Sequence, residues 1–107
     1  MISVKIKYDL EKVIKTIKCT KEEFELSIDI AFSQERMEKL DAIEPQTLEY
    51  RLPEESNRLG GLLSVCKRLS VSPWFGECLV DWWMTYDEPG EDKEVFSLYS
   101  KFPVTRG

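Results

Sequence analysis

Apolar and polar residues alternate over residues 2–8, and this pattern constrains the fold more than any other feature of the chain. Residues 2–8 read Ile-Ser-Val-Lys-Ile-Lys-Tyr. Successive side chains of a β-strand point to opposite faces, so a period of two is typical of a strand with one face buried. We therefore expect this strand to begin an N-terminal antiparallel or mixed sheet.

A short helix is expected directly after this strand. Asp9 is a good N-cap, and the apolar residues of 10–17 fall on one side of a helix, with the lysines on the other. A second strand that pairs with the first in a hairpin is the alternative for the same residues.

The next segment supports two interpretations. Apolar residues alternate over 23–32, which predicts a second strand, followed by a helix over 34–43. Thr20 and Glu23, however, have the spacing of a capping box, which favours one continuous helix over 21–43. The sequence alone leaves both interpretations open.

The second half predicts a pair of helices. An apolar stripe at helical spacing covers 54–70 and contains a Gly-Gly pair at 60–61, which indicates a kink or a close-packed neighbour. A Ser-Pro pair then opens a helix over 73–86. Short strands are expected around 48–50 and over 95–102.

A length of 107 residues is typical of one domain with one hydrophobic core. We therefore expect a single globular domain over residues 1–107. Its fold class is α+β, with the N-terminal antiparallel or mixed sheet and a helical pair in the second half.

The composition excludes most familiar catalytic sites. The chain has no histidine, so catalytic pairs and triads built on histidine are excluded, as are histidine metal sites. Neither a G-x-G-x-x-G nor a P-loop motif is present, and the carboxylates of 87–92 do not have the spacing of a calcium loop. We expect no enzyme activity, no catalytic residue, no metal and no cofactor.

The three cysteines are odd in number and form no C-x-x-C pair. The chain also shows no signal-peptide pattern at its start and no stretch of about 20 apolar residues. These features predict a reduced, cytoplasmic protein that does not enter a membrane. Cys66 and Cys78 are expected to be small buried core residues and not nucleophiles.

Charge is distributed in blocks. The chain as a whole has a net charge of −5. The net charge of individual segments is larger or opposite in sign: +4 over 1–21, −8 over 22–56 and −6 over 77–94. Such blocks either pair with one another inside the fold or present a field to a partner.

The acidic block 77–94 is interleaved with aromatic residues and includes the polar turn Asp-Glu-Pro-Gly-Glu-Asp at 87–92. If 73–86 is one helix, its two consecutive tryptophans lie about 100° apart, so at least one is near the surface. Exposed aromatic side chains anchor protein partners and carboxylates attract Lys and Arg, whereas burial in the core is the alternative for these aromatics. The candidate protein-binding residues are Trp74, Glu77, Asp81, Trp83, Tyr86, Asp87, Glu88, Glu91 and Asp92.

These observations lead to one functional hypothesis and one alternative. The hypothesis is a non-catalytic, acidic protein-binding module of the inhibitor, antitoxin or immunity type, which occupies a basic surface of a protein partner; the chain could also pair with itself as a homodimer. The alternative is a nucleic-acid-associated protein that uses the lysines of the N-terminal block. A nucleic acid is disfavoured because 73–86, the second helix of an apparent helix-turn-helix, has no Lys or Arg. The lysines in question are Lys5, Lys7, Lys12 and Lys15.

Overall fold

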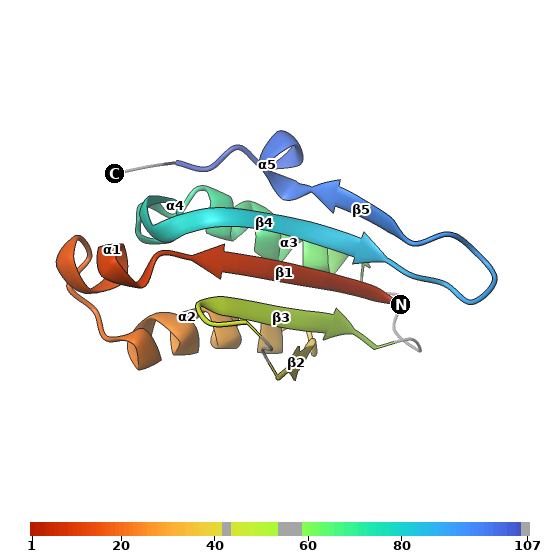
Figure 1. The fold of residues 1–107 in the computed structure, drawn as a ribbon, viewed down its shortest axis with the longest axis horizontal. Helices are drawn as coiled ribbons and strands as arrows, with labels where there is room; N and C mark the ends of the chain where they lie inside the picture. The colour runs from red at the N-terminus through yellow and green to blue at the C-terminus, as the bar shows by residue number, and fades with distance from the viewer. Residues whose placement is uncertain (42–43, 54–58, 106–107) are drawn as a thin grey trace.

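A computed structural model of the chain describes residues 1–41, 44–53 and 59–105. These residues form an antiparallel sheet of five strands in the order β2-β3-β1-β4-β5, together with five helices (Figure 1). The strands are β1 (Ile2–Tyr8), β2 (Glu38–Leu40), β3 (Thr47–Leu52), β4 (Leu79–Tyr86) and β5 (Glu94–Ser97). The helices are α1 (Leu10–Lys15), α2 (Lys21–Ser33), α3 (Leu59–Ser70), α4 (Pro73–Cys78) and α5 (Leu98–Lys101).

The predicted first strand is confirmed, and it lies at the centre of the sheet between β3 and β4. Val4, Ile6 and Tyr8 are buried on one face, as the alternation requires. The predicted helix after it is also confirmed as α1, and the side chain of Asp9 caps it by accepting hydrogen bonds from two backbone amides.

The molecule has two layers, because α2 and α3 lie behind one face of the sheet (Figure 1). Their apolar sides pack with the inner-facing residues of the three middle strands to form the core. The opposite face, called here the outer face, carries no helix of the described residues (Figure 1). None of the helices in the described part of the chain has the length and apolar character needed to cross a bilayer.

The predicted strand over 23–32 is wrong, because this segment lies inside helix α2. Thr20 and Glu23 form a complete capping box at its start. Phe24, Ile28 and Phe32 repeat every fourth residue and are buried. The apolar residues between them, which produced the apparent alternation, lie on the solvent side of the helix.

The continuous helix over 21–43 is wrong in its second half, and so is the separate helix over 34–43. The helix ends at Ser33, and Arg36 adopts a positive φ of 58° that no α-helix accommodates. The chain then enters β2, which pairs with β3. Residues 42–43 lie outside the described residues.

The predicted helix over 73–86 is correct only as far as Cys78. Pro73 opens α4 as expected, but Leu79–Tyr86 forms β4 and pairs with β1, with a shift of register at Val80. The β-branched and aromatic residues of this segment suit a strand, and β1 needs a partner on this edge. The two tryptophans therefore point to opposite faces, with Trp82 in the core and Trp83 on the outer face.

The remaining predictions are confirmed in part. The strand near 48–50 is β3, and the helix over 54–70 is α3 from Leu59 onward, while its expected start at 54–58 lies outside the described residues. A Cβ on Gly61 would overlap the side chain of Glu35, so one glycine of the pair does have a close-packed neighbour. The strand over 95–102 ends at Ser97 and gives way to α5. The α+β fold class is confirmed.

Candidate functional site

The structure places eight of the nine candidate residues in three places on or beside β4, while the ninth, Tyr86, ends the strand on the face opposite to Trp83. Asp81 and Trp83 lie on the outer face of β4. The acidic residues of 87–92 lie in the hairpin that joins β4 to β5, directly after Tyr86 (Figure 1). Trp74 and Glu77 belong to α4, at the opposite end of β4. The first two places adjoin each other, whereas the third is separated from the hairpin by the length of the strand.

Trp74 takes part in the packing between helices. Its ring lies edge-on to Phe24 at 5.8 Å and to Phe75 at 6.0 Å between centroids. The side chain is half-buried against the core. Trp74 therefore helps to hold α4 on α2, and it does not share a surface with the hairpin.

The outer face around Trp83 combines this one aromatic ring with positive and negative charges that almost balance. Lys5 lies opposite Trp83 across β1 and β4, with its Nζ 5.7 Å from the centre of the ring. Asp81 lies opposite Lys7 in the same way. A shallow depression of about 290 Å³ adjoins the ring and is lined by Asp81, Trp83, Val95 and Ser97.

The other charges of this face are also matched. Lys5 is opposite Glu49 across β1 and β3, and its Nζ lies 3.5 Å from a carboxylate oxygen of Glu44. Arg51 makes an ion pair with Glu38 on the neighbouring strand. Because each basic residue of the sheet has an acidic neighbour, this face provides little positive field for a phosphate backbone.

The hairpin tip, residues 87–94, is strongly acidic. Pro89 and Gly90 form its turn, in which the amide of Glu91 donates to the carbonyl of Glu88 at 3.1 Å and Gly90 has a φ of 85°. This confirms the predicted polar turn. The tip contains five carboxylates and one lysine.

The N-terminal amino group neutralises only one of these carboxylates. It lies 3.2 Å from Glu88 and also donates to the backbone carbonyl of Asp87. The carboxylates of Asp87, Glu91, Asp92 and Glu94 form no ion pair within the described residues. The negative charge of Glu88, followed by partial burial and the charges of Glu91 and Glu94, raises the pKa of Tyr86.

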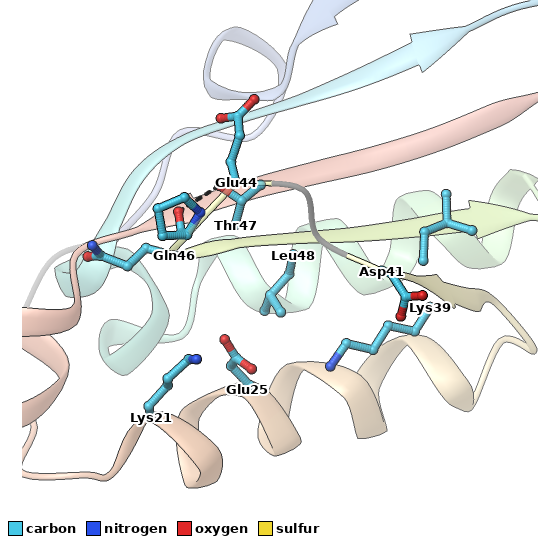
Figure 2. A pocket seen from close by; sticks show the side chains of 10 residues that line it. Lys21, Glu25, Lys39, Asp41, Glu44, Gln46, Thr47 and Leu48 are labelled. Atoms are coloured by element: carbon cyan, nitrogen blue, oxygen red, sulfur yellow. Dashed lines mark hydrogen bonds between the residues drawn. The ribbon is translucent and has the colours of Figure 1, made fainter.

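A polar pocket lies elsewhere, between the start of α2 and the loop before β3 (Figure 2). Its volume is about 380 Å³, and Lys21, Glu25 and Lys39 extend toward it from α2 and β2 (Figure 2). Sequence reasoning missed it because it left open whether 23–32 forms a strand or a helix. The available signal was the spacing of Lys21 and Glu25, which lie four residues apart and so one helical turn apart. The other lining residues are Leu40, Asp41, Glu44, Pro45, Gln46, Thr47 and Leu48.

The charged groups around this pocket are largely engaged within the chain. Tyr8 Oη donates to Glu25 at 2.5 Å. Asp29 accepts a hydrogen bond from Tyr50 and pairs with Lys39 at 3.0 Å. Burial, followed by the hydrogen bonds to these carboxylates, raises the pKa of both tyrosines above its usual value. These contacts tie α2 to the sheet and place no activated nucleophile beside a base.

The buried cysteines have the environment of core residues, as predicted. Burial raises the pKa of Cys66 to about 12. Burial, followed by the charge of Glu77, raises the pKa of Cys78 to about 11. The described residues contain no group of three or more Cys, Asp or Glu side chains placed to hold a metal ion.

Comparisons with known proteins found no match. No protein-family model matches the chain, and neither a curated protein nor a solved structure is significantly similar to it.

Proposed function

We propose that the chain is a non-catalytic protein-binding module that recognises a basic surface of a protein partner through the β4–β5 hairpin. The observation that carries the proposal is the acidic tip, whose carboxylates mostly have no cationic partner among the described residues, beside the uncovered face that bears Trp83. The inhibitor, antitoxin and immunity types belong to this class.

The two parts of this surface would contribute differently to binding. Carboxylates at the tip accelerate association with a Lys- and Arg-rich surface and make the rate sensitive to salt. Trp83 and the depression beside it offer a rigid aromatic contact next to an apolar side chain, Val95, which is 58% exposed. The partner is therefore expected to carry an apolar side chain next to a basic patch.

The nucleic-acid alternative receives less support from the same geometry. Of its four lysines, Lys5 and Lys7 lie among carboxylates on the outer face, and Lys15 pairs with Glu11 at 3.1 Å on α1. Three of the four lysines thus have a carboxylate as a neighbour, which weakens the positive field that phosphates require.

Affinity capture from the native lysate tests the proposal. The tagged chain is used with and without nuclease at two salt concentrations, beside the variant Glu91→Lys/Asp92→Lys. Its matched control, Glu22→Lys/Asp41→Lys, makes the same charge change on exposed residues away from the hairpin. We expect the unmodified chain and the control to capture a basic protein in stoichiometric amount, with or without nuclease. The hairpin variant should not capture it.

Two results would overturn the proposal. If the chain captures nucleic acid, and nuclease treatment abolishes that capture, the result would favour the nucleic-acid alternative. Equal retention of the protein partner by the hairpin variant and by its control would exclude the acidic tip from the interface.

A further inference from the structure

Strand β5 is exposed on three sides. It forms one edge of the sheet, so the backbone groups that point away from β4 have no strand partner in the described residues. Val95 on the outer face is 58% exposed, and Phe96 on the inner face is 46% exposed. In Figure 1, α2 and α3 lie behind the middle strands, and β5 lies beyond them.

Both sides of this edge offer room for side chains. An apolar pocket of about 470 Å³ follows the free edge of β5, where Met84, Phe96 and Leu98 line it from the inner side and Val95 and Ser97 also contribute. On the outer side lies the depression beside Trp83. Successive side chains of a strand point to opposite faces. The side chains of a strand added to β5 would therefore enter the two hollows alternately.

We propose that the occupant of this edge is β5 of a second copy of the chain, paired antiparallel across a two-fold axis perpendicular to the sheet. Such an axis keeps the two outer faces on the same side and requires a register in which one residue pairs with its own copy. In a register centred on the four residues of β5, that residue is Val95 or Phe96. The first register brings the two Val95 side chains together on the outer face, and the second brings the two Phe96 side chains together on the inner side.

The charges at the ends of β5 favour this orientation. An antiparallel pair brings the acidic start of one β5, at Glu94, to the end of the other, where Lys101 is exposed beside Phe96. It also places the two acidic hairpin tips at opposite ends of the joined edge. A parallel arrangement would put the tips side by side, where like charges repel. The proposal does not depend on recognition of a basic partner by the acidic tip, although the second copy would cover Val95 and the depression beside Trp83, which the proposed partner contact also uses.

Sedimentation equilibrium tests it on the full chain. Between about 5 and 500 µM, a range that spans micromolar affinities, we expect the apparent mass to rise from 12.5 kDa toward twice that value. The variant Val95→Lys/Phe96→Lys, which charges the edge, should stay monomeric throughout. Its matched control, Leu26→Lys/Ile30→Lys, charges the exposed apolar pair of α2, 56% and 50% exposed, and should dimerise like the unmodified chain.

A charge exchange tests the orientation. Lys101→Glu should weaken the dimer at least several-fold, and adding Glu94→Lys to it should restore much of the lost affinity. Hydrogen exchange on the unmodified chain needs no variant, and the amides of 94–97 should become more protected as concentration rises.

The inference is overturned by any one of three results. The first is a constant mass of one chain together with exchange at 94–97 that does not depend on concentration. The second is a dimer that survives Val95→Lys/Phe96→Lys. The third is a dimer that Leu26→Lys/Ile30→Lys abolishes, because the contact would then lie on α2. None of these results bears on partner capture by the acidic tip.

Discussion

Tyr8 Oη donates a hydrogen bond of 2.5 Å to Glu25 and thereby joins the central strand β1 to helix α2. Tyr8→Phe removes the donor and leaves the shape of the ring unchanged. Because a hydrogen bond to a charged group contributes about 1.5 to 3 kcal/mol, and Glu25 remains within reach of water, we expect a loss of about 1.5 kcal/mol. Urea denaturation at pH 7 measures it. Tyr86→Phe is the control and should change stability by less than about 0.5 kcal/mol; equal losses would contradict the assignment.

Tyr50 makes stability depend on alkaline pH. Its pKa in the folded protein lies above the usual 10.0, because burial, the hydrogen bond to Asp29 and the charge of Asp29 all disfavour the phenolate. The contribution of the protonated Tyr50 hydroxyl to stability is complete below about pH 10, where Tyr50 of the unfolded chain is also protonated. This contribution is lost as the pH rises further.

Urea denaturation between pH 8 and 11 measures this dependence. The free energy of unfolding should fall above about pH 10 by up to about 1.4 kcal/mol per pH unit for this group. Tyr50→Phe should remove that part of the slope while leaving the contributions of the lysines and other tyrosines. Parallel pH curves for the two proteins would show that Tyr50 ionises equally in both states.

Gly76 allows the C-terminal segment to pass close to α4. A Cβ at this position would collide with the carbonyl oxygen of Thr105, whose amide donates to Ser70 at 2.7 Å. Gly76→Ala should therefore destabilise the chain by about 1 to 3 kcal/mol and make residues 102–105 more accessible to proteases. Gly60→Ala, with open space around its Cβ, should instead stabilise α3 by up to about 1 kcal/mol. Thermal denaturation compares the two, and a neutral Gly76→Ala would place the C-terminal segment elsewhere.

The sequence predicted those helices and strands that depend on interactions between residues close together in the chain. The alternation of residues 2–8 predicted β1, and Asp9 predicted the start of α1. The capping box at Thr20 correctly favoured a helix, although the apolar alternation over 23–32 had favoured a strand. Leu26 and Ile30 explain the conflict, because they are apolar yet exposed on α2, and a pattern analysis counts them as core.

Long-range pairing determined the elements that the sequence did not predict. Residues 79–86 have helical spacing as well as strand propensity, and only the presence of β1 as a partner decides between them. The strand also changes the candidate site. It places Trp82 and Trp83 on opposite faces of the sheet and leaves Trp74 at the end of β4 away from the hairpin. The acidic turn at 87–92 was recognised correctly, because Pro89 and Gly90 specify it locally.

Trp82 is buried in the core, but its indole Nε1 has no hydrogen-bond partner within the described part of the chain. Its ring lies 5.1 Å from Phe75 and 6.4 Å from Phe102 between centroids, so the environment is apolar. An unsatisfied buried donor costs about 1 to 3 kcal/mol. Trp82→Phe removes that cost while losing some packing, and we expect a net change below about 1 kcal/mol.

Trp82→Ala supplies the contrast in the same urea titrations. It removes the whole ring and should cost about 3 to 5 kcal/mol, because a cavity remains where the aromatic cluster packed. Trp83→Phe, on the outer face, should change stability by less than about 0.5 kcal/mol. If Trp82→Phe proved as damaging as Trp82→Ala, the indole N–H would have to be bonded in the folded protein, and the account of an apolar pocket around it would fail.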